Sequence, residues 1–420
     1  MILRQKYNSP GYQHFALCRK IWIYYRTIRK HPLYYLLRIL IWLGLKVYCS
    51  NIRINKPELQ KSRGPLILAC NHPNAFLDAI ILGSLFHEPV HFLARGDAFR
   101  NPLVRKLLNA LKLIPVYRLT EGREYLNLNE ASFDKCHQIL KSGGIVLIFA
   151  EGLCLNQWLL RPMKKGTARI ALAAMNDEEL SPGVRILPVA LNYNSFQRPG
   201  KTVLIHFGEM ISKNDFPASR TEAEKMRYFN GLLAERLSAG MLQSSGHPQI
   251  IQTLITNHRP QPSFQLKKIQ APLISEIDIR LFQKLKMPGA FAAGSTAFFR
   301  NLLLTLVLLI PAAIGLALHA PLYIPLKRII RQKTRGTVFY DSVLFAALAL
   351  TYPAYWLLLN IIVQPLAGNL WARLPFLFMP LFGWISIYWE GCCLRIRNYL
   401  RLTPKERKIL TGILRKNTEV

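Results

Sequence analysis

The sequence predicts an α/β fold in which a mixed sheet is covered by helices, with an interfacial helical region before it and membrane helices after it. Between residues 64 and 210, short apolar runs alternate with amphipathic stretches, as strands alternate with helices. Residues 21–49 mix aromatic and aliphatic side chains with cations. Beyond residue 300, three segments are apolar enough to enter a bilayer.

The composition favours a membrane surface as the partner. Of the 420 residues 51% are hydrophobic, yet the formal net charge is +32. Nucleic acid also attracts positive charge. However, the chain has no zinc-finger spacing, no ribonucleoprotein-type aromatic motif and no basic-region heptads. We therefore expect membrane lipids as partners and no nucleic acid.

The cysteines indicate a reducing compartment. The chain has seven cysteines, an odd number, and no two of them have metal-ligand spacing. The adjacent Cys392 and Cys393 do not readily form a disulfide with each other. The first residues show neither the apolar core nor the cleavage site of a secretory signal peptide. The expected location is a membrane, with the functional site facing the cytoplasm and no metal bound.

Shifts in composition divide the chain into four predicted regions: interfacial helices at 1–58, a catalytic domain at 59–250, a connector at 251–295, and membrane-embedded helices with a basic tail at 296–420. Charges within 21–49 disfavour a full span, so we expect an aromatic face in lipid and cations on headgroups. The alternative for this segment is a helix packed on the catalytic core.

Six apolar runs predict the strands of the catalytic domain: Pro65–Leu68, Val90–Ala94, Leu113–Tyr117, Gly144–Phe149, Ile186–Leu191 and Val203–Phe207. Amphipathic helices are expected between strands at Asn129–Lys141 and Thr167–Met175. A further helix over Thr221–Met241 opens with the capping-box pattern Thr-x-x-Glu.

In the C-terminal region, the apolar segments lie near 301–325, 343–364 and 374–389. The basic stretches at 327–335 and 395–408 are both expected on the cytoplasmic side, which makes 343–389 a two-pass hairpin. A single crossing by 301–325 would then place the catalytic domain on the opposite side. A re-entrant segment broken by its prolines, Pro311 and Pro321, removes this conflict and is the expectation.

The first candidate for chemistry is the pair His72 and Asp78, which follows the apolar run Pro65–Leu68. An imidazole of pKa about 6.5 can accept a hydroxyl proton, and a carboxylate on its other nitrogen fixes the tautomer. Pro73 disfavours helix at His72 and predicts a turn. If Asn74 caps the following helix, the two side chains can meet. Alone, the pair is a weak signal, and a capping aspartate with a satisfied histidine is the simpler interpretation.

Three further segments place charge at predicted strand ends, the edge at which open α/β sheets bind ligands. Arg118 ends one strand and offers a guanidinium for phosphate. Glu151 and Gly152 end another, and the run 161–167 gathers Arg161, Lys164 and Lys165 before a predicted helix. Each has a simpler interpretation as a surface cation, a helix cap or a solvated charge run. Their order and placement favour one site.

This order of motifs resembles the glycerolipid acyltransferase family, which includes lysophosphatidic acid and glycerol-3-phosphate acyltransferases. Asn71-His72 and Asp78 match its Asn-His-x4-Asp motif with one extra residue between His and Asp. Ile114–Arg118 matches the second motif, Phe149–Gly152 matches the start of Phe-Pro-Glu-Gly-Thr-Arg, and Ile186–Val189 matches the fourth. Leu153 and Cys154 stand where the family has Thr and Arg. The resemblance covers about residues 60–210 and says little about 257–420.

The resemblance implies an acyltransferase-like fold and assigns roles residue by residue. His72 would be the general base and Asp78 its orienting partner. Arg118 would bind the acceptor's phosphate, and Glu151 with Gly152 would shape the acceptor site. Arg161 or Lys164 would supply the cation missing after Gly152, unless the acceptor differs from the common one. Asn71 and Lys165, the latter from the family's lysine-glycine pair, complete the expected substrate-binding set.

The implied reaction is O-acyl transfer to a lysophospholipid or glycerol 3-phosphate, without a cofactor. The donor is a thioester, either acyl-CoA or an acylated acyl carrier protein. A non-phosphate lipid acceptor is an alternative. So is a non-catalytic lipid-binding scaffold, in which His72 and Asp78 would be dispensable. A hydrolase with an acyl-enzyme would need a nucleophile, and the chain has no Gly-x-Ser-x-Gly elbow. The nearby thiols by sequence are Cys70 and Cys154.

Overall fold

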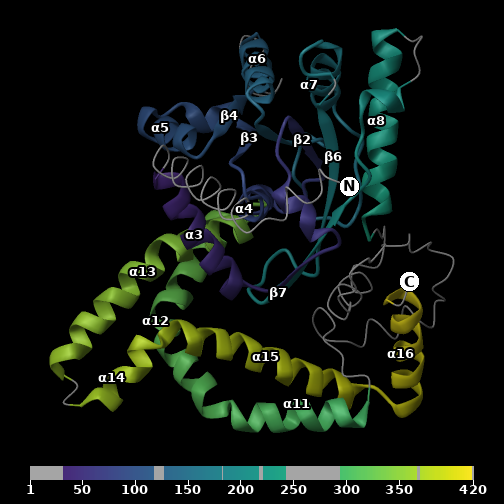
Figure 1. The fold of residues 1–420 in the computed structure, drawn as a ribbon. Coiled ribbons are helices and arrows are strands. Elements are labelled where there is room, and N and C mark those ends of the chain that lie inside the picture. Colours follow the sequence, from purple (N-terminus) through teal and green to yellow (C-terminus); the bar gives the residue numbers. More distant parts are fainter. Residues whose placement is uncertain are drawn as a thin grey trace, which may run out of the picture.

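The computed structural model describes residues 32–117, 127–181, 183–216, 221–242, 294–366 and 369–418. Its α/β domain has a seven-stranded sheet between two layers of helices, and a group of apolar helices lies beside that domain (Figure 1). All but the last two residues of the predicted connector at 251–295, and residues 1–31 of the predicted N-terminal region, fall outside the described residues, so those two expectations stay predictions.

The sheet has the order β1-β7-β6-β2-β5-β3-β4. Its strands are β1 (Cys49–Ile54), β2 (Leu66–Cys70), β3 (Val90–Arg95), β4 (Leu113–Val116), β5 (Ile145–Phe149), β6 (Arg185–Tyr193) and β7 (Lys201–Phe207). The strands β6, β2, β5, β3 and β4 are parallel, whereas β7 pairs antiparallel with β6 and β1 pairs parallel with β7. The predicted mixed sheet is therefore confirmed.

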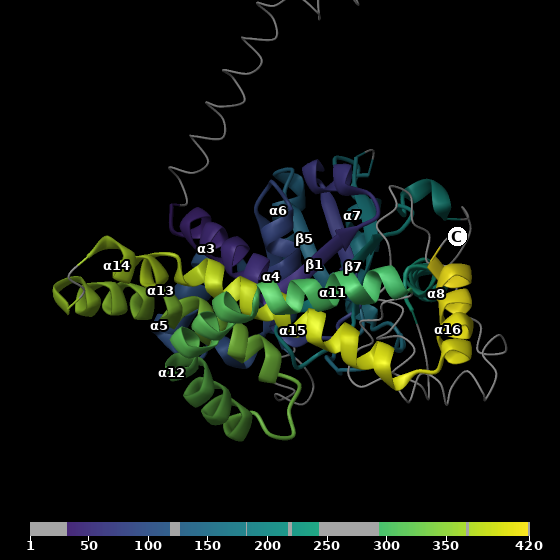
Figure 2. The same cartoon turned by 90° about the horizontal axis from the view of Figure 1, so that it is seen from below.

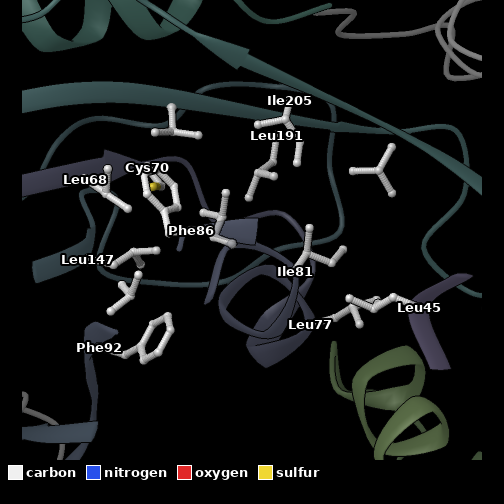
Figure 3. Close-up of a cluster of buried hydrophobic side chains, with 14 of the residues drawn as sticks. Leu45, Leu68, Cys70, Leu77, Ile81, Phe86, Phe92, Leu147, Leu191 and Ile205 are labelled. Carbon is white, nitrogen blue, oxygen red and sulfur yellow. The ribbon is translucent and has the colours of Figure 1, made fainter. Parts of the chain in front are cut away.

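Alternation along the strands builds a core on each face of the sheet, because successive side chains point to opposite sides. From β2, Leu68 and Cys70 enter one core and Ile67 and Ala69 the other. The first core is covered by α4 (Ala75–Leu85) and α3 (Pro32–Tyr48), and Figure 3 shows its labelled side chains. The second core is covered by α6 (Leu128–Lys141), α7 (Lys165–Asn176) and α8 (Glu222–Ala239).

The six predicted strands all occur, with ends shifted by one or a few residues, and the capping box of α8 is present with Thr221 and Glu224. Sequence reasoning missed β1, whose run Cys49–Ile54 includes exposed polar residues. This strand pairs only with β7 at the edge of the sheet, so it needs fewer apolar residues than a central strand. It also missed the short amphipathic α5 (Pro102–Ala110).

Helix α3 packs on the domain, as the alternative for its segment predicted, while its interfacial placement stays a prediction. Tyr35, Leu45 and Tyr48 are buried against the domain, whereas Leu36 and Leu43 are exposed on the opposite side. The helix thus packs on the core and also presents apolar side chains outward, as an interfacial helix would.

The C-terminal region consists of α11 (Ser295–Val307), α12 (Leu309–Lys333), α13 (Tyr340–Leu366), α14 (Leu370–Leu377), α15 (Met379–Arg401) and α16 (Pro404–Thr418). Seen from below, α11 to α15 spread across one side of the α/β domain (Figure 2). Among the described residues, α12 and α13 are long and apolar enough to cross a membrane, and α14 with α15 forms a third candidate bent by 68°. Their apolar surfaces are largely uncovered by protein, so these helices associate the chain with a membrane.

The break near the start of the first apolar segment has a local cause. Helices α11 and α12 separate at Leu308. Pro311 has no N–H to donate to the carbonyl of Val307, so the helical ladder is interrupted there. By contrast, α12 continues through Pro321 and Pro325 as one helix. The expected break at Pro321 is therefore wrong, because α12 tolerates that proline inside the helix.

One end of α13 belongs to the α/β domain rather than to the apolar layer. Its first residues include the buried Asp341, Ser342, Leu344 and Phe345, while the rest of the helix is mostly exposed. The Phe345 ring lies edge-on to Tyr48 of α3, with centroids 5.2 Å apart, and joins the core above β2. The helix begins beside α4 and then runs away from the domain (Figure 1).

Candidate active site

The strand register brings the first candidate residues together. In the parallel pair β2 and β5, Cys70 lies opposite Phe149. His72 and Glu151 each lie two residues beyond this pair, at the same edge of the sheet. The backbone N–H of His72 donates to Glu151 Oε1 at 3.3 Å. Two of the sequence motifs are thus joined directly by the geometry of the sheet.

The His72 and Asp78 side chains meet, with 2.9 Å between His72 Nδ1 and Asp78 Oδ2. The intervening turn contains Pro73 and places Ala75 at a φ of 48°. A left-handed conformation is unfavourable for alanine by roughly 1–2 kcal/mol. The turn therefore accommodates its six-position spacing through a strained backbone that the surrounding contacts must hold.

Asp78 is fully buried and its carboxylate accepts three hydrogen bonds. Oδ2 accepts from His72 Nδ1 and, at 2.8 Å, from the backbone N–H of Asn74. Oδ1 accepts from the Tyr193 hydroxyl at 2.6 Å. Burial and the nearby Asp78 charge raise the pKa of Tyr193 well above its ordinary value, so Tyr193 stays protonated and donates. Three donors stabilise a buried carboxylate in its charged form.

The imidazole of His72 has a fixed orientation. Its ring stacks on Phe149 with centroids 3.8 Å apart and planes 12° apart. With Nδ1–H donated to Asp78, the neutral ring carries its free lone pair on Nε2. No described residue bonds to Nε2, and the side chain keeps 14% of its surface exposed. Nε2 is therefore available as a base toward a bound hydroxyl.

The start of α4 is capped differently from the sequence expectation. Asn74 occupies the N-cap position but makes no side-chain cap bond. Instead, Cys154 Sγ accepts from Ala75 N at 2.8 Å, and Ser342 Oγ from α13 accepts from Leu77 N at 3.0 Å. The Asn74 side chain is drawn away because it donates to Asp341 at 2.7 Å. Distant residues thus replace the local cap.

Glu151 is held from two sides. Its Oε1 accepts from the His72 backbone, and Oε2 accepts from Arg161 Nε at 2.7 Å. Arg161 also donates to the carbonyl of Leu153. Burial raises the pKa of Glu151, and the Arg161 charge opposes that rise. The structure thus places Arg161 beside the motif position from which a cation is missing.

Gly152 and Lys164 pack against each other where β5 leads into the loop before α7. Gly152 has a φ of 67°, and a Cβ there would lie 2.8 Å from Lys164 Cγ. Only glycine therefore fits this conformation without a shift. Lys164 is the N-cap residue of α7 and Lys165 its first residue, and both are exposed. Within the described ranges, neither ammonium group is engaged in an ion pair.

The remaining two predicted residues fare differently. Asn71 is buried, and its amide bonds both the N–H and the carbonyl of Leu191 in β6, at 2.8 and 3.0 Å. Its contacts are with the backbone of the sheet rather than with an open surface, so it fixes β2 to β6 immediately before His72. Arg118 lies outside the described residues, one position beyond Tyr117.

The two thiols considered as nucleophiles are poorly suited to that role. Burial, with a further contribution from the Asp78 charge, raises the pKa of Cys70 well above its ordinary value and that of Cys154 to about 12. The thiolate, which is the nucleophilic form, is therefore scarce at neutral pH. Cys154 Sγ also accepts the Ala75 hydrogen bond described above.

Sequence reasoning missed Tyr193, Asp341 and Ser342. Tyr193 ends an apolar strand and gave no sign of its polar contact. For Asp341 a signal existed: it is an acidic residue in the first turn of an apolar helix, a place where an ionisable side chain usually has a partner. Its partners lie far away in the sequence, so the sequence could mark Asp341 but not connect it.

A cavity of about 290 Å³ lies near the same edge, between the starts of β1 and β7 and helix α15. Its lining includes Lys201, Arg198, Arg395 and Glu390, but not His72 or Asp78. Arg198 pairs with Glu390 across it. This cavity is therefore distinct from the position of the His72 imidazole. Among the described residues, no cluster of His, Cys, Asp or Glu could hold a metal ion.

Comparison with known proteins matches the part of the chain that carries this site. A family model described as acyltransferase matches residues 51–192. The 1-acyl-sn-glycerol-3-phosphate acyltransferase of Bacillus subtilis (strain 168) is 27% identical over 195 residues, which cover 46% of this chain and 86% of that protein. Among solved structures, the 1-acyl-sn-glycerophosphate (LPA) acyltransferase PlsC of Thermotoga maritima matches with 20% identity and a TM-score of 0.35, covering 55% of this chain and 89% of that one.

Proposed function

We propose that this chain, whose domain at residues 51–192 belongs to the glycerolipid acyltransferase family, is a membrane-bound enzyme that acylates a lipid hydroxyl from a thioester. Acyl transfer in lipid synthesis is the family's activity. The observation that carries the mechanism is the contact of 2.9 Å between His72 Nδ1 and the buried Asp78. It leaves Nε2 as a base at the sheet edge.

In the proposed reaction, the acceptor hydroxyl donates its proton to His72 Nε2 as its oxygen attacks the thioester carbonyl. The tetrahedral intermediate then expels the thiol sulfur, which takes the same proton from the imidazolium. An ester and a free thiol result, and the enzyme returns to its starting state. Asp78 stabilises the transient imidazolium through Nδ1 without taking its proton. Base catalysis of this kind typically contributes about 10²–10⁴ in rate.

Phosphate recognition is proposed for cations near the dyad. Lys164 and Lys165 lie exposed at the start of α7, where the helix dipole also favours an anion. Arg161 is engaged by Glu151, so it contributes charge while holding the loop. Arg118 is proposed to join them from the end of the β4 segment. The acceptor proposed first is a 1-acylglycerol 3-phosphate, the substrate class named for the Bacillus relative, with glycerol 3-phosphate as the alternative.

An apolar loop beside these cations suits a lipid acceptor. Between Gly152 and Arg161 the chain exposes Leu153, Leu155 and Leu159. Leu153 replaces the threonine of the family motif. Exposed leucines next to a catalytic histidine and a cationic cluster offer a place for a lipid tail and its phosphate at once. A lysophospholipid combines both features, whereas glycerol 3-phosphate lacks the tail.

The site is proposed to face the cytoplasm, where acyl-CoA or acyl carrier protein is available. The basic stretch Lys327–Arg335 directly precedes α13, and the first turn of α13 packs on the α/β domain. The domain and this basic stretch therefore lie at the same end of α13. By the positive-inside tendency that end is cytoplasmic.

The test is acyl transfer by purified protein in phospholipid vesicles, using radiolabelled acyl-CoA and acyl carrier protein with three acceptors: 1-acylglycerol 3-phosphate, glycerol 3-phosphate and monoacylglycerol. We expect labelled phosphatidic acid from the first acceptor, and loss of at least about 100-fold in kcat for His72→Ala with unchanged vesicle binding. His137→Ala is the matched control, because that histidine lies on α6 and pairs with Asp177 at the end of α7, away from the dyad.

Two outcomes would overturn the proposal. Full activity of His72→Ala would remove the general base. No transfer by the wild-type protein from any thioester to any acceptor, with tight vesicle binding retained, would favour the lipid-binding scaffold. Phosphate recognition is tested separately. Arg118→Ala and Lys164→Ala should raise KM for the phosphorylated acceptor. An equal rise in KM for monoacylglycerol would show that these cations do not recognise phosphate.

A further inference from the structure

The start of α13 lies against the turn that carries His72 and Asp78. It comes from residues 340–342, far along the chain and outside the segment 51–192 that matches the acyltransferase family. Asp341 and Ser342 are both fully buried, although the helix that they begin is mostly exposed and apolar. A buried acid at the end of such a helix calls for a specific set of partners.

Asp341 has three side-chain partners, all from the α/β domain and α3. Its Oδ1 accepts from the Tyr48 hydroxyl at 2.6 Å. Its Oδ2 accepts from Asn74 Nδ2 at 2.7 Å and from the fully buried Lys201 ammonium. Asp341 therefore ties together α3, the start of β7 and the catalytic turn.

Ser342 holds the same turn by a second pair of bonds. Its hydroxyl donates to the carbonyl of Asn74 and accepts from the N–H of Leu77, both at 3.0 Å. Asn74 is thus hydrogen-bonded at its side chain to Asp341 and at its carbonyl to Ser342. Its remaining backbone group, the N–H, donates to Asp78 Oδ2 at 2.8 Å. That oxygen is the one that bonds His72 Nδ1.

From this chain of contacts we infer that Asp341 and Ser342 are positioning residues, which use Asn74 to hold the Asp78–His72 pair in its reactive geometry. The apolar C-terminal region then does more than attach the protein to a membrane, since its helix α13 completes the active site. This inference rests on the proposed function, because it assigns a role in the proposed reaction.

The turn needs such support for a reason visible in its backbone. Ala75 adopts a φ of 48°, and the Asn74 side chain does not cap α4. A strained turn of this kind persists only where its surroundings determine it. The reaction is sensitive to its placement, because a shift of about 1 Å in a catalytic group can lower a rate by about 100-fold.

The rival explanation is a purely structural role for the buried Asp341–Lys201 pair. It can be tested because both charges can be removed together. Removing one partner alone leaves a buried, unpaired ion, which destabilises the fold. Removing both together avoids that effect. The pair Asp341→Leu with Lys201→Met eliminates the charges and also the contacts to Asn74 and Tyr48. The pair Asp341→Asn with Lys201→Met eliminates the charges but keeps an amide that can bond both Asn74 and Tyr48.

The experiment compares these two double variants with wild type in phospholipid vesicles, using acyl-CoA and 1-acylglycerol 3-phosphate. For D341L/K201M we expect kcat to fall by about 10- to 100-fold, KM values within about threefold of wild type, and a similar Tm. For D341N/K201M we expect kcat within about fivefold of wild type. Ser342→Ala should lower kcat by a smaller factor, again with KM unchanged.

Retained kcat in D341L/K201M would overturn the inference, as would equal losses of kcat in the two double variants. A fall in activity that follows a fall in Tm would assign Asp341 to stability instead and would also overturn it. These outcomes are distinct from failure of the proposed function, which would appear as a lack of acyl transfer in the wild-type protein itself.

Discussion

Strand β2 (5 residues) and helix α13 (27 residues) are both apolar runs, yet they have opposite surroundings. All five residues of β2 are fully buried between two helical layers. In α13 the side chains of Leu350, Leu357 and Leu366 are more than half exposed. Apolar composition alone therefore does not distinguish a protein core from a lipid-facing surface. Length and the pattern of the neighbouring segments make that distinction.

The boundary between these two regions runs through α13 itself. Near its start, Asp341, Ser342, Leu344 and Phe345 are buried like β2, whereas the rest of the helix resembles a membrane span. The buried polar contacts at the start of this helix thus fall on the turn that carries His72 and Asp78. This difference supports the inference that the membrane region helps to hold the proposed active site, and the following predictions test that inference.

The largest effect is expected at the dyad. Asp78→Asn should lower kcat by about 10²–10⁴, because an amide can present its N–H to His72 and neither fixes the productive tautomer nor balances the imidazolium. Tyr193→Phe, which removes only one of the three donors to Asp78, should lower kcat by about tenfold or less. Steady-state acyl transfer in vesicles measures both. Equal effects of the two variants would contradict this ranking.

The next effect separates the two ends of α13. Phe345→Ala should lower the free energy of unfolding of the α/β domain by about 3–5 kcal/mol, because it leaves a cavity beside Tyr48. Leu357→Ala, in the exposed part of the same helix, should change it by less than about 0.5 kcal/mol. Hydrogen exchange of the β2 amides in micelles measures both values. Similar losses would mean that the whole helix packs on the domain.

Acid should affect the packed region selectively. Burial lowers the pKa of His206, in β7, to about 4, compared with about 6.5 in an unfolded chain. The unfolded state therefore takes up this proton first. The contribution of His206 to the free energy of unfolding is fully present above about pH 6.5. It is lost as the pH drops toward 4, which lowers the stability by roughly 2–3 kcal/mol. His206→Gln should flatten that dependence.

Chemical unfolding in micelles between pH 7 and 4 measures this effect, with circular dichroism reporting the helices of the membrane region in the same samples. We expect the α/β domain to lose stability while α12 and α13 remain helical. An unchanged pH dependence in His206→Gln would assign the acid sensitivity to other groups.

The sequence predicted the sheet and most of the candidate site because both depend on local signals. Apolar runs mark buried strands, and residues that follow them, such as His72 and Glu151, must lie at one edge of a parallel sheet. The contact between His72 and Asp78 needed only a turn, which Pro73 indicated. Edge strand β1 was not predicted, because a strand paired on one side needs no continuous apolar run.

What the sequence could not predict are contacts between segments far apart in the chain. Asn74 looked like a helix cap because its type and position fit that role. Its side chain instead meets Asp341, 267 positions away, and Ser342 supplies the cap. Tyr193 was hidden in an apolar strand for the same reason. These hydrogen-bond partners depend on which distant segment packs beside the turn, and no local sequence pattern indicates that packing.

The most direct test of the central claim, that α13 acts on the reaction through Asp78, is a comparison of kcat ratios in two backgrounds. With Asp78 present, kcat of D341L/K201M should be about tenfold or more below that of D341N/K201M. In an Asp78→Asn background the same ratio should approach one, because the carboxylate that Asn74 positions is gone. A ratio that stays the same in both backgrounds would show that Asp341 and Asp78 act independently, and would contradict the claim.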